Sequence, residues 1–257
     1  MTSGVAIPDR LNATIVLLRH GESTYVAEGR FQGRHDPPLS EVGRRQAALA
    51  GSRLSRPGAS PALPLPNARP LEIVHSPLER AAETARAVQA ADTEGEAARA
   101  PLRPEGGLVE IGQGEWEGMT ADVVRARWGD RVDAWRRDPL AASAPGGERL
   151  AVVADRVRPT LDRIIADLAA AAAPGPAEPW SIVVGHDGVF KVALLALFGL
   201  PLDRFWVFSF ALCGISIVEL REGRAILRAH GLTEHLAPLL DERARALAEA
   251  RERSGAL

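Results

Sequence analysis

The sequence predicts an α/β fold: a three-layer α/β/α sandwich around a mostly parallel central sheet. Short apolar runs rich in β-branched residues alternate along the chain with longer segments that carry the periodicity of helices. The 257 residues are 46% hydrophobic and 25% charged, which is typical of a soluble globular protein that can bury a sizeable core. Strands joined by helical crossovers become parallel neighbours, so these observations favour the sandwich.

The chain is expected to form one domain over residues 1–257. No internal repeat is evident, and two proline-rich stretches, near 56–70 and 174–179, each lie between a predicted helix and the next strand. Proline and glycine in such places are typical of loops. We therefore expect loop insertions within one domain instead of a linker between two.

The first part of the chain predicts two strands and two helices. The run Ala13–Leu18 is apolar and β-branched, as expected of a buried strand. Ser40 can cap a helix over Val42–Leu54, because its hydroxyl accepts a hydrogen bond from an amide of the first turn. A second apolar run predicts a strand at Leu71–His75, and the alanine-rich segment Leu78–Ala91 predicts a helix.

The second part repeats this alternation. Residues 92–107 are expected to be irregular, and Ala121–Trp135 to form a helix broken near Gly129. After a loop at 138–147, apolar periodicity predicts a long helix over Glu148–Ala173, kinked or split by Pro159. A strand, a buried helix, a hairpin and a charged helix should follow at Trp180–Val184, Val189–Phe198, Ile215–Leu220 with Ala225–His230, and Leu236–Arg253.

Charge and cysteine content exclude several classes of function. The net charge of −2 gives no general attraction to nucleic acid or to an anionic membrane, so neither is expected as a partner. Lys191 is the only lysine among 31 basic residues; codon preference accounts for most of the arginines. Cys213 is the only cysteine, which excludes an internal disulfide and a cysteine zinc cluster. With no signal-like start and no bilayer-length apolar stretch, the expected location is the cytoplasm.

Histidines and arginines follow three of the predicted strands. The segment 19–22 (RHGE) follows the first strand, 75–80 (HSPLER) the second, and 185–188 (GHDG) the strand at Trp180–Val184. In open α/β sheets, ligands bind beyond the carboxyl ends of the strands. One histidine at such a place would indicate little, but this recurrence predicts a shared site, and guanidinium groups match phosphate or carboxylate oxygens.

Six motifs in one order resemble the signature of the histidine phosphatase superfamily, also called the phosphoglycerate mutase-like family. They are LLRHGES, GRFQGRHDPPLSEVGRRQA, SPLERAAETA, LVEIGQGEWEG, PGGERL and VVGHDGV, which begin at Leu17, Gly29, Ser76, Leu108, Pro145 and Val183. The closing LTEHL at 232–236 is also similar, so the resemblance covers roughly residues 13–236. It implies the phosphoglycerate mutase-like form of the predicted sandwich.

The resemblance implies covalent catalysis on His20. A neutral imidazole nitrogen can attack phosphorus and form a phosphohistidine. Arg19 and Arg80 would clamp the phosphoryl oxygens, and His186 would stabilise the same charge as a protonated donor. Gly21 and Gly188 have no Cβ and would therefore let the backbone approach the phosphate. The residues expected to bind phosphate or substrate are Arg19, Gly21, Arg30, Gln32, Gly33, Arg80, His186, Asp187 and Gly188.

A leaving alkoxide needs a proton, so the site requires an acid. Glu110 matches the position of the family's proton donor within LVEIGQGEWEG. Asp187 competes for this role, because another branch of the superfamily has a His-Asp pair here and uses the aspartate as the acid. We favour Glu110, since its whole surrounding motif fits.

The segment around Arg30 is implied to fold over the phosphate and the substrate. Whether Arg30 contacts the ligand or braces the loop stays open. The chain departs from the family pattern at Val26, where many relatives carry an asparagine that helps to bind phosphate. His235, in the closing segment, is expected to support the site indirectly, through residues that themselves contact the ligand. The remaining histidines, His35, His75 and His230, are expected in loops or packing.

Three functions are compatible with this family. A phosphomonoesterase transfers the phosphoryl group to water, a cofactor-dependent phosphoglycerate mutase transfers it to a substrate hydroxyl, and a binding module transfers nothing. Little room exists between Trp116 and Pro145 for the insertion that mutases carry, which favours the phosphatase. The expected substrate is a small phosphorylated metabolite, and no metal or cofactor is expected, because arginines supply the positive charge. The aromatic cluster at 205–208 is expected in the core or in a homodimer contact.

Overall fold

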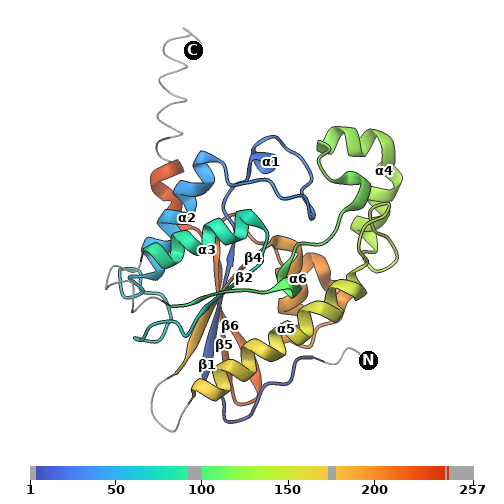
Figure 1. The fold of residues 1–257 in the computed structure, drawn as a ribbon. Coiled ribbons are helices and arrows are strands. Elements are labelled where there is room, and N and C mark those ends of the chain that lie inside the picture. The colour runs from blue at the N-terminus through green and yellow to red at the C-terminus, as the bar shows by residue number, and fades with distance from the viewer. Residues whose placement is uncertain (1–3, 92–99, 173–177, 241, 243–257) are drawn as a thin grey trace.

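A computed structural model of the chain describes residues 4–91, 100–172, 178–240 and 242 (Figure 1). One six-stranded sheet runs in the order β3-β2-β4-β1-β5-β6. β1 pairs parallel with β4, and β2 pairs parallel with both β4 and β3, whereas β5 and β6 add antiparallel pairings. The strands are β1 Ala13–Arg19, β2 Ile73–His75, β3 Leu102–Pro104, β4 Trp180–Gly185, β5 Ile215–Arg221 and β6 Arg224–Leu232.

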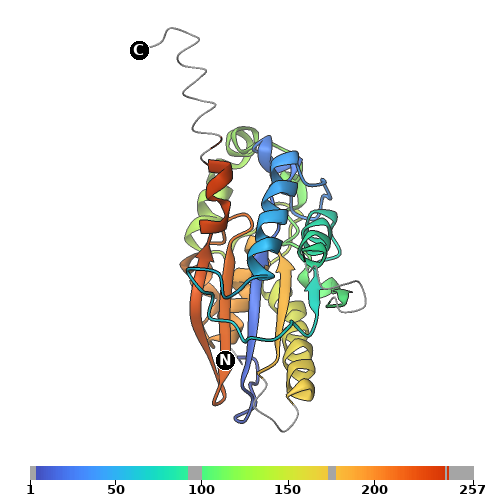
Figure 2. The ribbon, with the colours of Figure 1, turned by 90° about the vertical axis from the view of Figure 1, so that its left-hand side faces the viewer.

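Helices cover both faces of this sheet, which confirms the three-layer α/β/α sandwich (Figures 1 and 2). α2 and α3 lie on one face, and α5 and α6 lie on the other. The α-helices are α1 Thr24–Ala27, α2 Glu41–Leu54, α3 Glu79–Ala90, α4 Ala121–Arg137, α5 Leu150–Ala171 and α6 Asp187–Leu197. Short 3-10 turns are η2 Gly106–Leu108, η3 Gly114–Trp116, η4 Leu202–Val207 and η5 Glu234–Leu236.

The central strand β1 shows why two cores form. Successive side chains of a strand point to opposite faces of the sheet. Ile15 and Leu17 therefore enter the core beneath α5 and α6, whereas Val16 and Leu18 enter the core beneath α2 and α3. All four side chains are fully buried. An unbroken apolar run is thus what a strand covered on both faces requires.

The predicted helix starts and interruptions have mixed outcomes. The Ser40 hydroxyl accepts a hydrogen bond from the Gly43 amide at 3.0 Å, which confirms the predicted cap of α2. α4 is kinked at Trp128, one residue before the predicted break, and continues to Arg137. Of the two outcomes predicted at Pro159, a kink or a split, the split does not occur, because α5 runs through this residue as one element. Proline removes one backbone hydrogen bond there, while the buried side chains before and after it keep α5 on the sheet.

Two regions that the sequence predicts to be irregular, 92–107 and 174–179, differ in what the structure describes of them. The stretch 92–107 was expected to lack structure, but it contains β3 and the first residues of η2. β3 pairs with β2 over three residues and ends at Pro104 at the edge of the sheet. The prediction for 174–179 falls mostly outside the described residues, as does the predicted terminal helix beyond residue 242. No helix among the described residues is long and apolar enough to cross a membrane.

The register of the parallel strands brings the three predicted strand ends together. Arg19 of β1 pairs with Gly185 of β4, so His20 and His186 follow at adjacent positions. His75 of β2 pairs with Val184 of β4, which places Ser76 beside the same strand end. These carboxyl ends point toward the part of the molecule where α1 and α4 lie (Figure 1).

Candidate active site

His20 lies buried at the carboxyl end of β1. Its backbone amide donates to the Gly185 carbonyl of β4 at 2.9 Å, which extends the parallel pairing by one residue. Its ring nitrogen Nδ1 lies 2.6 Å from the Gly21 carbonyl. A carbonyl oxygen only accepts hydrogen bonds, so Nδ1 carries the proton and the neutral ring keeps its lone pair on Nε2.

The surroundings of His20 keep its imidazole neutral. Burial lowers the pKa of His20 well below its usual value, and the positive charges of Arg80 and Arg19 lower it further. The hydrogen bond to Gly21 acts in the opposite direction but is the smallest of these effects. A neutral imidazole is the nucleophilic form, so the site holds His20 ready to attack an electrophile.

His186 faces His20 from the start of α6. The two ring centres lie 5.0 Å apart in an edge-to-face arrangement. Burial lowers the pKa of His186 well below its usual value, and Arg80, His20 and Arg19 add repulsion. Burial and the charges of Arg80 and Arg19 therefore favour a neutral His186 in the ligand-free protein. The protonated donor expected from the sequence concerns the phosphate-bound state and stays a prediction.

Ser76 is a site residue that the sequence analysis did not single out. Its hydroxyl lies 2.8 Å from Nε2 of His186, and its backbone amide donates to the Val184 carbonyl. The side chain is fully buried, so this contact fixes the orientation of the His186 ring. The signal was available, since Ser76 follows β2 directly and opens the SPLER motif.

The two arginines are held by backbone carbonyls. Arg19 donates from Nη1 to the Phe210 carbonyl at 2.5 Å. Arg80 is fully buried and donates to the carbonyls of Gly33 and His35 at 2.9 and 2.8 Å. These contacts fix each guanidinium while leaving some of its donors for another acceptor.

Three buried nitrogen atoms of the site lack a hydrogen-bond partner among the described residues. They are Nε of Arg19, Nε of Arg80 and Nδ1 of His186. Buried polar groups are almost always paired in folded proteins, so an unpaired group calls for an explanation. An oxyanion bound beside His20 would supply acceptors to a site that already holds two guanidinium charges.

Glu110 reaches the start of α6 from the segment after η2. Its Oε1 accepts from the amides of Ile111 and Val189 at 2.9 and 3.2 Å, and its Oε2 accepts from the Gly188 amide at 3.3 Å. Burial raises the pKa of Glu110 above its usual value, and the charge of Asp187 adds to this effect. A raised pKa makes a carboxyl group a better proton donor near neutral pH.

Asp187 is occupied by other partners. Its Oδ2 forms an ion pair with Lys191 at 2.7 Å, and its Oδ1 accepts from the Phe210 amide at 3.0 Å. Lys191 in turn lies over the rings of Phe205 and Trp206. Both oxygens of Asp187 therefore have partners within the fold. The bond to the Phe210 amide helps to fix Phe210, whose carbonyl accepts from Arg19.

The two motif glycines are required by protein contacts beside them. A Cβ on Gly21 would lie 2.5 Å from the Gly43 carbonyl oxygen, at the first turn of α2. A Cβ on Gly188 would lie 2.7 Å from Oε1 of Glu110. α2 and the Glu110 carboxyl group therefore lie where a side chain at Gly21 or Gly188 would have to fit.

Arg30 braces the loop that carries it. It donates to the Glu28 carboxylate at 2.6 Å and to the Gly118 carbonyl at 2.7 Å. Gln32 accepts from the Ser23 hydroxyl at 2.6 Å, and Gly33 contributes its carbonyl to Arg80. These contacts favour the bracing alternative for Arg30 and tie the loop 28–33 to the site through Arg80.

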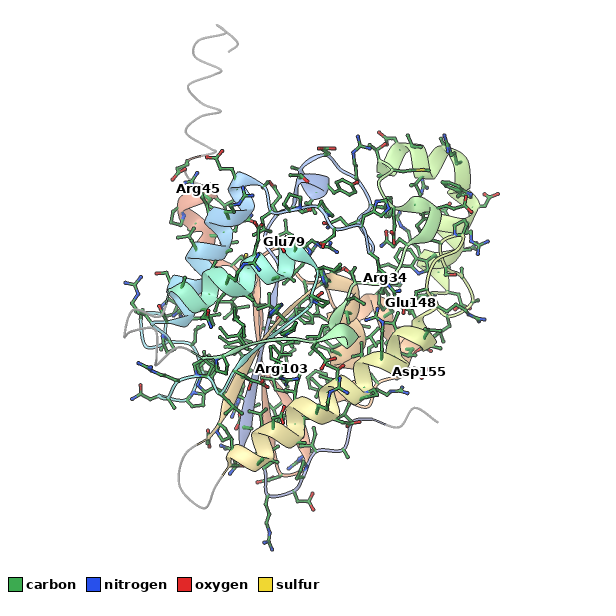
Figure 3. All side chains as sticks on the ribbon, viewed as in Figure 1. Arg34, Arg45, Glu79, Arg103, Glu148 and Asp155 are labelled. Atoms are coloured by element: carbon green, nitrogen blue, oxygen red, sulfur yellow. The ribbon has the colours of Figure 1, made fainter. Side chains whose placement is uncertain are left out.

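A separate apolar cluster supports the segments above the strand ends. Trp116 is buried and contacts the ring of Phe31 at 5.6 Å and that of Trp135 at 5.9 Å. Val124 and Val132 of α4 complete this cluster. Figure 3 shows Arg34 and Glu148 near the upper end of α5. Packing in this cluster therefore joins the segment around Trp116 to α4.

The other histidines lie outside the cluster around His20. His235 contacts the Cys213 carbonyl at 3.1 Å, and the Cys213 amide donates to the carbonyls of Arg19 and His20, so His235 acts on the site only through this turn. His230 contacts the Ser216 hydroxyl between β5 and β6. His75 bonds to the Ser76 carbonyl at 2.9 Å.

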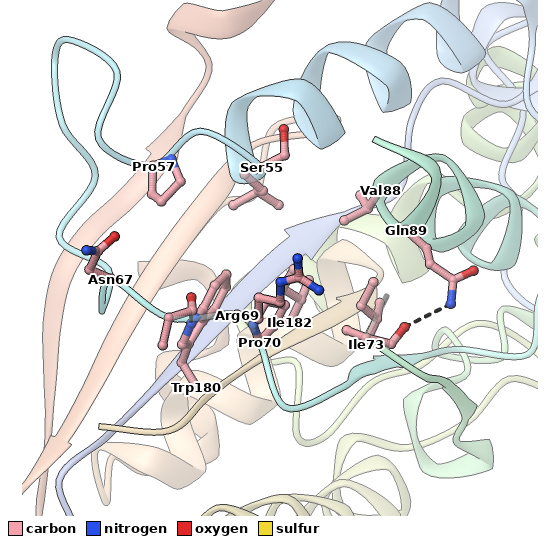
Figure 4. A pocket seen from close by; sticks show the side chains of 13 residues that line it. Ser55, Pro57, Asn67, Arg69, Pro70, Ile73, Val88, Gln89, Trp180 and Ile182 are labelled. Atoms are coloured by element: carbon pink, nitrogen blue, oxygen red, sulfur yellow. Dashed lines mark hydrogen bonds between the residues drawn. The ribbon is translucent and has the colours of Figure 1, made fainter. Parts of the chain in front are cut away.

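The proline-rich loop 56–70 lies at the other end of the sheet. Together with α2 and α3 it borders a cavity of about 310 Å³ (Figure 4). Three sheet residues line it: Ile73 and Trp180 begin β2 and β4, and Ile182 lies in the first half of β4. The indole of Trp180 donates to the Ala68 carbonyl at 2.8 Å, which anchors the loop there. This cavity is therefore remote from the carboxyl end of β1, where His20 lies.

Titration of the ligand-free protein followed by NMR is expected to show His20 and His186 neutral well below pH 6.5, since both pKa values are lowered. Saturating inorganic phosphate is expected to raise the pKa of His186, because the anion offsets the repulsion from Arg19 and Arg80. His235 is the control, since burial lowers its pKa and the repelling arginine there is Arg53. An unchanged His186 pKa in bound protein would contradict an anion site here.

Comparisons with known proteins agree with this geometry. The model of the histidine phosphatase superfamily (branch 1) matches residues 15–233. The chain is 29% identical over 237 residues to phosphoserine phosphatase 1 of Hydrogenobacter thermophilus, covering 91% of this chain and 99% of that protein. It is 36% identical over 193 residues to glucosyl-3-phosphoglycerate phosphatase of Mycolicibacterium vanbaalenii, covering 74% and 76%.

A solved structure is similar over most of its length. The mycobacterial glucosyl-3-phosphoglycerate phosphatase Rv2419c, in a structure with VO3, superimposes with a TM-score of 0.69. The two chains are 27% identical, and the match covers 86% of this chain and all of the other. The mixed sheet and its two helical layers are therefore shared with a phosphatase of known structure.

Proposed function

Because this chain belongs to branch 1 of the histidine phosphatase superfamily, we propose that it hydrolyses phosphomonoesters of small metabolites through a phosphohistidine on His20. The observation that carries the proposal is the buried, neutral imidazole of His20, whose Nε2 is left unprotonated by the bond from Nδ1 to Gly21. Arg19, Arg80 and His186 would receive the phosphoryl oxygens. In this proposal residues 1–257 form a single domain.

The first half of the reaction transfers the phosphoryl group to the enzyme. Nε2 of His20 attacks phosphorus, and the bond from phosphorus to the ester oxygen breaks. Glu110 gives its proton to the departing oxygen. Nδ1 of His20 keeps its proton, and the Gly21 carbonyl stabilises the positive charge that the ring acquires.

The second half releases phosphate. A water oxygen attacks phosphorus, the bond from phosphorus to nitrogen breaks, and its electron pair returns to Nε2 of His20. Glu110, now a carboxylate, takes the proton of the water. The two arginines hold the charge of the phosphoryl group in both halves, so the proposal includes no metal and no cofactor.

The names of the relatives indicate which kind of leaving group the site would have to protonate. Their names state phosphoserine and a glucosylated phosphoglycerate, and in both the group that departs from phosphorus is an alkoxide oxygen. An alkoxide is a poor leaving group and needs a proton, which fits a Glu110 whose pKa is raised. A small phosphorylated metabolite is therefore the proposed substrate, with the cytoplasm as the proposed location and a homodimer as a proposed assembly.

A panel of alkyl phosphomonoesters, assayed for released phosphate beside a mutase assay on 3-phosphoglycerate, tests the proposed function. We expect phosphate release from at least one alkyl ester and no net conversion of 3-phosphoglycerate to its isomer. Isomerisation without phosphate release would support the mutase. Binding of a phosphorylated metabolite without turnover in either assay would support the non-catalytic module.

A further inference from the structure

The guanidinium of Arg156, on α5, holds the segment that carries Glu110. Nη1 donates to the carbonyls of Gly107 and Val109, both at 2.7 Å. Nη2 donates to the carbonyl of Glu110 itself at 3.2 Å. Three carbonyls within four consecutive residues thus converge on one side chain. That convergence fixes the path of the backbone up to the Glu110 Cα.

The remaining donors of Arg156 bind Glu148 in a bidentate pair. Nε donates to Oε1 at 3.0 Å, and Nη2 donates to Oε2 at 2.9 Å. We call Arg156 and Glu148 together the clamp on Glu110. Glu148 holds the chain beyond Glu110, because its Oε2 accepts from the Gly112 amide at 3.2 Å and its own amide donates to the Gly112 carbonyl at 2.7 Å. The pair therefore grips the chain on both sides of Glu110.

This clamp is an ion pair away from bulk solvent. The Arg156 side chain is 18% exposed and that of Glu148 is 8% exposed. Burial acts to raise the pKa of Glu148, yet hydrogen bonds and the charge of Arg156 keep it lowered. The five N–H groups of an arginine are all engaged here, so the guanidinium has no donor left for a phosphoryl group.

The Glu110 carboxyl group is confined by contacts with the start of α6. It accepts from the amides of Gly188 and Val189 at the start of α6, and a Cβ on Gly188 would approach it to 2.7 Å. A shift of the 107–112 segment would therefore lengthen these contacts. A misplacement of about 1 Å can slow a reaction about 100-fold.

We propose that Arg156 is a positioning residue, which through its pair with Glu148 holds Glu110 where it can protonate the leaving group. The proposal rests on the function proposed above, specifically on Glu110 as the acid. Lysine cannot replace Arg156, because one ammonium cannot form the bidentate pair and also reach three carbonyls. The role is expected to appear as a dependence on the leaving group.

Arg156→Lys is therefore expected to lower kcat/KM for an alkyl phosphate about 10- to 100-fold and for p-nitrophenyl phosphate less than about threefold. Here kcat/KM is the measure because it reports the first phosphoryl transfer and not the later attack of water. Nitrophenolate leaves without a proton, so this first transfer does not need Glu110. In the double variant with Glu110→Gln, adding Arg156→Lys should cost less than about threefold further, since both changes remove one function. Equal slowing of both substrates by Arg156→Lys, or full additivity with Glu110→Gln, would overturn the proposal.

A matched control, Arg163, lies about two turns further along the same helix. Arg163 pairs with Glu105 at 2.7 Å and is 53% exposed, so Arg163→Lys should leave both rates unchanged within about twofold. Glu148→Gln is the second variant, in case Arg156→Lys does not fold, and should show the same leaving-group dependence. If Glu110→Gln itself shows no such dependence, the proposed acid fails; if it does and both clamp variants do not, only the positioning role fails.

Discussion

His20→Ala is expected to lower kcat/KM for every phosphomonoester by at least about 10,000-fold, because loss of the nucleophile removes the covalent route altogether. The other imidazole of the site, His186, has its Nε2 bonded to the Ser76 hydroxyl, whereas Nε2 of His20 has no such partner among the described residues. Released phosphate measures the rate. Brief incubation with radioactive substrate and quenching in base should leave acid-labile label on the wild type and none on the variant.

The control for this prediction is a second histidine in the same local setting. His75 ends β2, is buried, and bonds through Nδ1 to the next carbonyl, as His20 does at the end of β1. His75→Ala should keep activity within about tenfold and keep the label, because the covalent step does not use it. Retained label in His20→Ala would show that another group accepts the phosphoryl group.

Glu110→Gln is expected to lower kcat/KM, which reports the first phosphoryl transfer, about 1,000-fold for alkyl phosphates and less than about tenfold for p-nitrophenyl phosphate. Glutamine keeps the shape of the side chain but has no proton to give. The pKa of Glu110 is raised, so wild-type activity on alkyl esters should fall as pH rises through that pKa and the acid is lost. This alkaline decline should vanish in Glu110→Gln, as measured by pH profiles of kcat/KM, which report the free enzyme.

Asp187→Asn is the comparison that separates the two candidate acids. It should slow both substrates by similar factors, because it weakens the ion pair with Lys191 and the support of the Phe210 carbonyl that receives Arg19. It should also lower the melting temperature, since a buried Lys191 loses its charged partner. A larger loss on the alkyl ester for Asp187→Asn than for Glu110→Gln would assign the acid to Asp187.

The layered fold was predictable because its main strands are covered on both faces. An apolar β-branched run such as Ala13–Leu18 has few alternatives in a chain that also carries long amphipathic helices. β3 was missed because three residues ending in proline give no periodicity, and its pairing depends on β2, about 30 residues earlier. The continuity of α5 through Pro159 likewise depends on packing against the sheet.

The candidate site was predictable only as far as its motifs extend. The positions after strands identified His20 and His186, and the motif around Glu110 identified the acid. The charge state of His186 could not be predicted, because it depends on burial and on how close Arg80 and Arg19 come in the folded chain. The clamp on Glu110 was not predictable for the same reason, since α5 approaches that segment only through the tertiary fold.

The burial of Lys191 has a consequence for chemical modification of this protein. It is the only lysine in the sequence, and it is 5% exposed, with its ammonium between Asp187 and two aromatic rings. Acylating reagents and lysine-directed cross-linkers therefore find no accessible ε-amine while the core is closed. Any acylation of Lys191 would report an opening of α6 near the site, which makes this residue a single-position reporter of local unfolding.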